Sequence, residues 1–227
     1  MALYKGFDHL TRPHLLPRGV SGRYDERWFD YWRFVGHELL VTLFVSLMRT
    51  DRWEIVGRLL AQEFLVENPS NGNHRMQTYE YFSHTVQFFY LRDQQKRQRS
   101  CVSHCQKIGE RHGEGGLLAE RIPIREFAET DYLLGLRSAF SGSYDRGRYH
   151  ECWIPNSIYS MFDTPRFLYL AQQRSFAERL LGVLAVPSIE SLRSKFNETR
   201  GFLAIATDNA PLPNSIDSFD ANSLGSR

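Results

Sequence analysis

The sequence is poor in cysteine and contains no long hydrophobic run. Three cysteines in 227 residues are too few, and odd in number, for a disulfide scaffold, so they favour a reducing compartment. The longest apolar run spans residues 39–48, which is well short of the ~18 residues needed to cross a bilayer. Residues 1–9 contain no apolar core of signal-peptide length. These absences predict a cytoplasmic protein that does not bind or cross a membrane.

The common motifs of catalysis and nucleotide binding are also missing. The chain has no Gly-rich phosphate loop, no GxSxG elbow, no HExxH pair and no alternation of strand and helix patterns. We therefore expect no hydrolase or nucleotide-binding fold built on a parallel sheet, and no bound cofactor. The 28 Lys and Arg residues and 26 Asp and Glu residues leave a net charge of +2. So small a charge gives no overall field that attracts nucleic acid, so such binding needs a local patch.

Most of the sequence repeats apolar residues at helical spacing. This pattern predicts an all-α, multi-helix bundle of about six helices. Thr50 is the expected N-cap of the second helix, and Thr164 and Pro165 are the expected start of the fifth. A Pro and a Gly among short polar residues predict a loop at 68–73. The expected helices are 24–47, 51–66, 77–111, 122–140, a helix from 164 to about 181, and 188–199.

Composition predicts three parts along the chain. Residues 1–23 contain prolines and glycines among scattered apolar residues and form an irregular N-terminal arm. Residues 24–207 form a single helical domain, in which 202–206 are a short strand or a packed extended segment. Residues 208–227, rich in Asn, Ser, Asp and Pro, form a disordered tail.

Residues 97–113 combine arginines, two cysteines and two histidines in one predicted helix. The first chemistry that fits them is RNA cleavage, with His104 as general base and Arg97 or Arg99 stabilising the charged phosphate. On a continuous helix Arg97 lies within roughly 20° of His104, whereas Arg99 lies some 140° away. Arg97 is therefore the better-placed partner. A solvated basic helix face is the alternative interpretation.

The second chemistry is metal binding. Cys101 and Cys105 are four residues apart, so they project from one helical face, and His112 or the pair His150 and Cys152 would complete the ligands for zinc. The alternative is that these cysteines are buried without a metal, because a thiol behaves as a small hydrophobic group.

The third chemistry is contact with nucleic acid or an acidic partner. Residues 92–111 hold six cations and two anions, and three of the cations recur at i, i+4 and i+7 to form a basic ridge. An ordinary soluble helix face is again the alternative. The expected contact residues are Arg92, Lys96, Arg99 and Lys107.

Two further polar residues, His37 and Glu38, lie in the most apolar predicted helix. They have the side chains of an acid–base pair. We interpret His37 instead as a histidine packed in the core with one hydrogen bond.

Two resemblances accompany these patterns. His104 follows Arg99 in the segment Arg99-Ser-Cys-Val-Ser-His104, and it follows Arg97 at a longer spacing. Both pairs resemble the Arg-x4-6-His motif of the HEPN family of helical nucleases. That resemblance implies a metal-independent ribonuclease. The second resemblance rests on three segments: "HELLVTLFVSLMRTDRWEIVGRLLAQEF", "RQRSCVSHCQKIGERH" and "FAETDYLLGLRSAF". Together these segments resemble helical modules of bacterial conflict and anti-phage defence proteins. They imply a regulatory, sensing or effector-associated module of a multi-protein assembly.

The sequence as a whole favours a helical interaction or regulatory protein that docks to a protein partner or to itself. Its aromatic and arginine side chains are of the kind enriched at interfaces. The ribonuclease with His104 is the alternative function, and RNA contact through the 92–111 ridge accompanies either.

Overall fold

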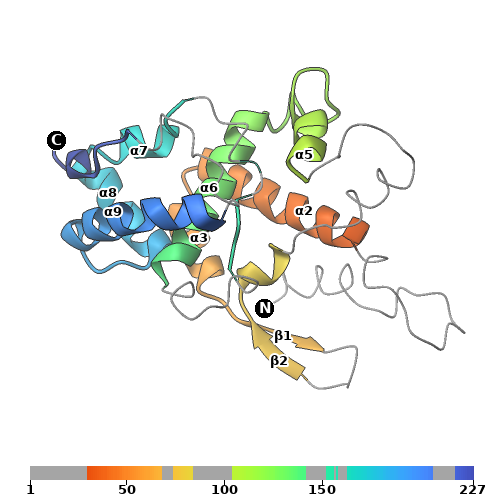
Figure 1. The fold of residues 1–227 in the computed structure, drawn as a ribbon, viewed down its shortest axis with the longest axis horizontal. Helices are drawn as coiled ribbons and strands as arrows, with labels where there is room; N and C mark the ends of the chain where they lie inside the picture. The colour runs from red at the N-terminus through yellow and green to blue at the C-terminus, as the bar shows by residue number, and fades with distance from the viewer. Residues whose placement is uncertain are drawn as a thin grey trace, which may run out of the picture.

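A computed structural model describes residues 30–67, 74–83, 104–141, 152–155, 157, 163–206 and 218–227. Within these residues α-helices enclose one hydrophobic core, and a small two-stranded sheet projects from it (Figure 1). The predicted all-α class is therefore confirmed. The α-helices are α2 (Asp30–Arg49), α3 (Trp53–Leu60), α5 (His104–His112), α6 (Ile124–Phe140), α7 (Arg166–Leu170), α8 (Arg174–Leu184) and α9 (Ile189–Ala206). The remaining elements are strands β1 (Phe64–Glu67) and β2 (His74–Gln77) and 3-10 helices η3 (Tyr79–Phe82) and η7 (Ala221–Ser223).

Helix α6 lies inside the bundle, with α2, α5, α8 and α9 packed around it (Figure 1). It begins after Pro123, as predicted, because proline favours a position at the start of a helix. Every residue of the stretch 127–136 is buried. A helix surrounded on all sides is normally apolar all round, so the polar residues inside this stretch must find partners within the protein.

Helices α3 and α8 cross at close range because Gly57 has no side chain. A Cβ atom at Gly57 would lie 3.0 Å from the carbonyl oxygen of Gly182, closer than ordinary van der Waals contact. Around this crossing α3 buries Trp53, Val56 and Leu60. The Trp53 ring meets the ring of Phe176 edge to face, with centroids 5.0 Å apart.

The predicted helix 51–66 is too long. Thr50 does not cap it: its hydroxyl donates to the carbonyls of Ser46 and Leu47, 3.0 and 3.1 Å away, at the end of α2. The helix ends at Leu60, and β1 takes the place of the last predicted turn. Strand β1 pairs antiparallel with β2, and the predicted loop 68–73 between them lies outside the described residues.

The predicted continuous helix 77–111 is wrong at its start. Gln77 ends β2, Thr78 is extended with φ −105° and ψ −176°, and η3 follows as a single short 3-10 helix. Tyr79 and Phe82 are buried there, so the core holds this segment in a non-helical path. Residues 84–103 lie outside the described part of the chain, and α5 forms the predicted last part of the helix.

The C-terminal predictions need two corrections. Helix α9 continues through 202–206, where a strand or extended segment was expected. Residues 218–227 fold back onto the bundle instead of being disordered. The amide of Gly225 donates to the carbonyl of Ala171 at 2.7 Å, and Phe219 packs against Phe196 with centroids 5.6 Å apart. Residues 1–23 and 208–217 lie outside the described residues.

The predicted start at 164–165 is close, since α7 begins at Arg166 with Pro165 in the N-cap position. The helix is interrupted after Leu170, and α8 begins at Arg174. None of the helices in the described part of the chain has the length and hydropathy of a membrane span.

Candidate functional site

The structure describes only part of the predicted Arg, His and Cys cluster. On α5, Cys105 is half-buried, and Lys107 forms an ion pair with Glu110 at 2.5 Å. Cys152 is buried next to Trp153. Within the described residues, no three His, Cys, Asp or Glu side chains converge as metal ligands. The predicted residues that lie outside the described part are Arg92, Lys96, Arg97, Arg99, Cys101 and His150.

His104 is buried at the start of α5, with 5% of its surface exposed. Its Nε2 lies 3.1 Å from Nδ1 of His37 on α2, and its ring centroid lies 5.1 Å from that of Phe34. Burial lowers the pKa of His104 well below its ordinary value, and the neighbouring His37 lowers it further. The interpretation of position 104 as part of a solvated helix face is therefore wrong.

His37 belongs to a second buried contact on its other side. Its Nε2 lies 3.4 Å from Oδ1 of Asp131 on α6, and its ring stacks on Trp153 with centroids 5.0 Å apart. The carboxylate of Asp131 accepts hydrogen bonds from Nε1 of Trp153 at 2.8 Å and from the amide and hydroxyl of Ser157 at 2.8 and 2.7 Å. The interpretation of His37 as a packed core histidine with one hydrogen bond is confirmed.

The surroundings of the two rings favour one arrangement of their protons. A carboxylate oxygen 3.4 Å away favours a proton on Nε2 of His37, which leaves Nδ1 of His37 as the acceptor. Nε2–H of His104 then donates to that Nδ1. Nδ1 of His104 is left as a buried acceptor with no hydrogen-bond donor among the described residues, and Nε2 of His37 meets Asp131 at ion-pair distance without forming a hydrogen bond. The ring of His104 is neutral in this arrangement, which agrees with its low pKa.

Glu38, the next residue on α2, anchors the other end of α5. Its carboxylate accepts two hydrogen bonds from the guanidinium of Arg111, at 2.6 and 2.9 Å, and lies 3.1 Å from Nε2 of His112. Nδ1 of His112 lies 2.8 Å from the carbonyl oxygen of Ile122. Burial alone raises the pKa of Glu38, but hydrogen bonds from His112 and Arg111 and the charge of Arg111 outweigh it, so the pKa lies below its ordinary value.

Together these contacts form a buried polar cluster, of which only Arg111 is half-buried: His37 and Glu38 on α2, His104, Arg111 and His112 on α5, Asp131 on α6, and Trp153 and Ser157. On α5 the members recur at i, i+7 and i+8, with buried Ile108 at i+4, so one face of the helix turns inward. The cluster therefore joins α5, α2, α6 and the 152–157 segment.

The arrangement of the cluster does not suit nucleophilic catalysis. In a Ser-His-Asp triad the histidine lies between the serine and the aspartate and takes the serine proton. Here Asp131 lies between Ser157 and His37, and the Ser157 hydroxyl donates directly to the carboxylate. The three side chains are also buried. The geometry of this cluster joins helices and does not match that of a Ser-His-Asp triad.

Sequence reasoning missed Asp131, Ser157 and the contact of Glu38 with α5. One signal was available for Asp131, because Glu129, Thr130 and Asp131 interrupt the otherwise apolar stretch 127–136. Polar residues at such positions need buried partners. No comparable signal marks Ser157, which lies in a segment without helical spacing.

The chain matches no protein-family model, no curated protein and no solved structure. The HEPN and defence-module resemblances therefore stay predictions. Of the HEPN-like motif the structure describes His104 but neither Arg97 nor Arg99.

Proposed function

We propose that the protein is a helical interaction or regulatory subunit that docks to a protein partner through its β-hairpin. The observation that carries this proposal is the exposure of Leu65 on β1 and Met76 on β2, at 51% and 53%. The two residues are direct cross-strand partners. The two side chains form a small apolar pair on the exposed face of the hairpin, and we infer that a partner covers this pair.

The geometry of the hairpin supports docking by addition of a strand. Phe64 turns toward the helices and stacks on Phe82 with ring centroids 5.5 Å apart, so the next residue, Leu65, faces away. Among the described residues neither strand pairs with a third strand. We therefore propose that an extended segment of the partner adds to one of these two strands. Figure 1 shows the hairpin standing clear of the helices that surround α6.

The partner segment that fits this surface is an extended strand with apolar residues at alternate positions. One face of such a strand continues the Leu65 and Met76 pair across the sheet. Each strand has four residues and offers only a short edge to a partner. We therefore propose that the hairpin sets the specificity of docking and that other surface of the bundle supplies the rest of the buried interface area.

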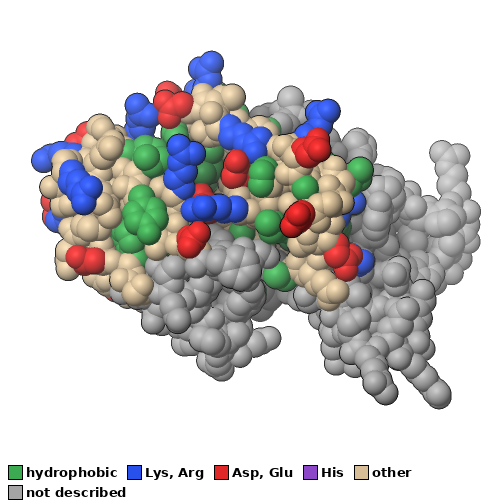
Figure 2. All heavy atoms as spheres, turned by 90° about the horizontal axis from the view of Figure 1, so that it is seen from above, with side chains coloured by type: hydrophobic (Ala, Val, Ile, Leu, Met, Phe, Trp, Pro, Cys, Tyr) green, Lys and Arg blue, Asp and Glu red, His purple; other side chains and the backbone are tan. Residues whose placement is uncertain are grey.

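Two lines of support distinguish this function from the ribonuclease. Burial and low basicity of His104 disfavour its use as the general base of an RNA-cleaving site. Basic and acidic side chains are interspersed on the described face seen in Figure 2, instead of forming a patch of one sign that tracks phosphates. The resemblance of three segments to defence modules leads us to place the docked complex in a cytoplasmic anti-phage assembly.

Photo-crosslinking from the hairpin tests the docking proposal. We expect p-benzoylphenylalanine at position 76 to give one discrete adduct with a single partner protein in the native host. The same label at the exposed Glu178 of α8 is the matched control and should give none. With the captured partner purified, Leu65→Glu should weaken binding at least tenfold, because a charge replaces an apolar contact. Equal adducts from both positions, or unchanged affinity for Leu65→Glu, contradict the proposal.

Incubation with total RNA separates the alternative. We expect no cleavage by the purified chain, with or without His104→Gln. If the original chain cleaves RNA and His104→Gln abolishes the cleavage, the ribonuclease hypothesis is correct. Docking is then not the main activity of the protein.

A further inference from the structure

The C-terminal segment 218–227 is held by α8, α9 and the residues between α7 and α8. Phe219, Ala221 and Leu224 are buried there, although the segment contains only one short 3-10 helix, η7. Figure 1 shows the segment at the end of the bundle where α7 and α8 meet. The residues that receive it form what we call the docking surface: Ala171, Gln172, Arg174, Ala177, Ile189, Arg193 and Phe196.

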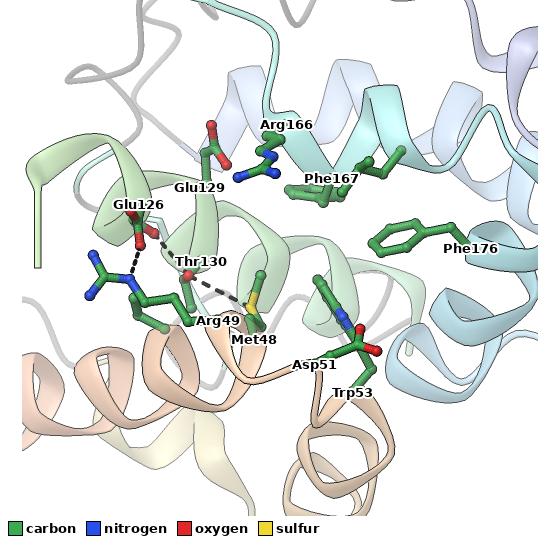
Figure 3. A pocket seen from close by; sticks show the side chains of 12 residues that line it. Met48, Arg49, Asp51, Trp53, Glu126, Glu129, Thr130, Arg166, Phe167 and Phe176 are labelled. Atoms are coloured by element: carbon green, nitrogen blue, oxygen red, sulfur yellow. Dashed lines mark hydrogen bonds and ion pairs between the residues drawn. The ribbon is translucent and has the colours of Figure 1, made fainter.

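The docking surface is separate from the hollow among α2, α3, α6, α7 and α8, since the two share no residue. In the hollow, shown in Figure 3, the side chains already contact one another. Arg49 pairs with Glu126, and the buried rings of Trp53 and Phe176 pack together. The hollow is therefore occupied by its own lining, whereas the docking surface holds another segment of the chain.

Two positions of the segment are recognised by side-chain shape. The ring of Phe219 packs on that of Phe196, with centroids 5.6 Å apart. Gly225 has φ +63°, and a Cβ atom there would lie 2.9 Å from Cδ1 of Ile189 and 3.6 Å from Cβ of Ala177. Glycine alone combines that conformation with the absence of a side chain. The docking surface therefore selects an aromatic residue and, six positions later, a glycine.

The backbone of the segment is also recognised. The guanidinium of Arg193 donates two hydrogen bonds to the carbonyl of Leu224, at 2.9 and 2.6 Å. Three backbone bonds join the segment to the chain between α7 and α8: Gly225 N–H to the Ala171 carbonyl at 2.7 Å, Arg227 N–H to the Gln172 carbonyl at 3.0 Å, and Arg174 N–H to the Arg227 carbonyl at 2.9 Å. Main-chain bonds that give affinity, with side-chain sites that give specificity, are the two parts of a peptide-recognition surface.

The connection between α9 and the segment is longer than the return path needs. Residues 207–217, which lie outside the described residues, form this connection. Eleven residues can span at most ~36 Å. From Ala206 back to Phe196, α9 rises only ~15 Å. The segment can therefore leave the docking surface while α9 stays folded.

We propose that the docking surface is a peptide-binding site, and that residues 218–227 occupy it in place of a partner segment of the same pattern. The pattern is read from the contacts: an aromatic residue, a small residue two positions later, a leucine five positions later and a glycine directly after it. The chain's own segment is then an autoinhibitory occupant that the partner segment displaces. The inference does not depend on the function of the hairpin.

The tether sets the size of the expected effect. A segment joined to its own binding site competes at an effective concentration on the order of 1 mM. A partner segment with a dissociation constant of about 10 µM is therefore weakened about a hundredfold while the chain's own segment is docked.

Fluorescence anisotropy with a labelled, C-terminally amidated peptide of residues 218–227 tests the proposal. Leu224→Asp in the full chain should release its own segment, because the charge replaces a side chain that is 1% exposed. We expect the peptide to bind this variant about a hundredfold more tightly than the unsubstituted chain. Asn222→Asp adds the same charge at an exposed position of the segment, so this matched control should bind the peptide as weakly as the unsubstituted chain.

Two further measurements test the location and the specificity. Arg193→Gln added to Leu224→Asp should weaken the peptide about fivefold, since the bonds to the Leu224 carbonyl are lost. A peptide that itself carries Leu224→Asp should bind none of the chains. Absence of binding to a Leu224→Asp chain that melts cooperatively, equal binding to the unsubstituted chain, or equal binding of the two peptides overturns the proposal.

A cut chain keeps the test decisive if Leu224→Asp does not fold. A protease site placed within 207–217 of the full chain is cleaved after folding, so the original segment starts in its place. We expect the labelled peptide to exchange with the released fragment, as followed by size-exclusion chromatography. A fragment that stays bound against excess peptide, or a body that unfolds when the fragment leaves, contradicts a separable peptide site.

Discussion

Helices α5 and α3 are both short and both pack on the same bundle, but different chemistry holds each in place. On α5, His104, Arg111 and His112 form polar contacts with His37 and Glu38 of α2. Helix α3 packs on α8 through apolar side chains and the glycine crossing. The attachment of α5 to α2 therefore depends on the protonation and the presence of single side chains. The attachment of α3 to α8 depends on the fit between side-chain shapes.

The energetics of the two attachments differ accordingly. A buried ion pair adds little net stability, because both charges lose water, but removal of one partner leaves the other uncompensated. Apolar packing adds many small dispersion contacts and tolerates no overlap of atoms. Changes of charge or pH should therefore act on α5, and changes of side-chain volume should act on α3.

Removal of the Glu38 carboxylate should have the largest effect. We expect Glu38→Ala to lower the free energy of unfolding by about 3 kcal/mol, the low end of the range for a broken buried ion pair, because Arg111 remains 37% exposed and keeps part of its hydration. Urea unfolding measures the loss, and hydrogen exchange should increase first in residues 104–112. Glu110→Ala is the control, since its pair with Lys107 is exposed and is worth less than ~1 kcal/mol. Equal losses for the two variants contradict the special role of Glu38.

The glycine crossing gives the next largest effect. Gly57→Ala should lower the free energy of unfolding by about 2 kcal/mol, because its Cβ meets the backbone of Gly182 and forces α3 away from α8. Gly182→Ala is the matched control, since its Cβ meets nothing within 4 Å. That control should gain up to ~1 kcal/mol from the higher helix propensity of alanine. Thermal melts of both variants measure these two changes in stability. An increase in stability for Gly57→Ala would falsify the close crossing of α3 and α8.

The pH dependence of stability comes third. The folded pKa of His104 is lowered, so below the ordinary histidine value near ~6.5 the unfolded chain binds a proton that the folded chain does not. The contribution of His104 is therefore fully present above pH ~6.5 and is lost as pH falls toward its folded pKa. The loss reaches up to ~1.4 kcal/mol per pH unit. Urea titrations from pH 7.5 to 5 should show a smaller slope for His104→Gln, and identical slopes contradict the account.

Release of the C-terminal segment should have the smallest effect. The guanidinium of Arg193 donates two hydrogen bonds to the carbonyl of Leu224, at 2.9 and 2.6 Å. We expect Arg193→Gln to cost about 1 kcal/mol and to increase hydrogen exchange in 218–227 while leaving 104–112 unchanged. Arg58→Gln on the exposed face of α3 should change neither segment.

Helices with a strong apolar period and a clear start could be predicted from the sequence. Pro123 marks the start of α6, and the apolar residues that follow keep it helical to Phe140. The start of α9 after Ser188 is similarly clear, since the Ser188 hydroxyl accepts a hydrogen bond from the amide of Ser191 at 3.2 Å. Local propensity and tertiary packing agree at these sites, so a single sequence suffices.

The hairpin and the C-terminal segment could not be predicted because long-range contacts decide them. Strand β1 places one residue, Phe64, against η3, which a four-residue pattern does not signal. Residues 218–227 have the composition of a disordered tail, yet Phe219 and Leu224 are buried against the bundle. The candidate site was predicted in part: His104 was identified, but its burial follows from Phe34 and His37, which lie about seventy residues earlier in the chain.

The titration of His104 by NMR tests the central claim most directly, namely that the polar face of α5 is buried against α2. The resonance is assigned by its loss in His104→Gln, and its chemical shift is followed from pH 8 to 5. We predict no titration near pH 6.5, because burial keeps the ring neutral well below that value. A midpoint at or above ~6.5, as for an exposed histidine, would contradict the account.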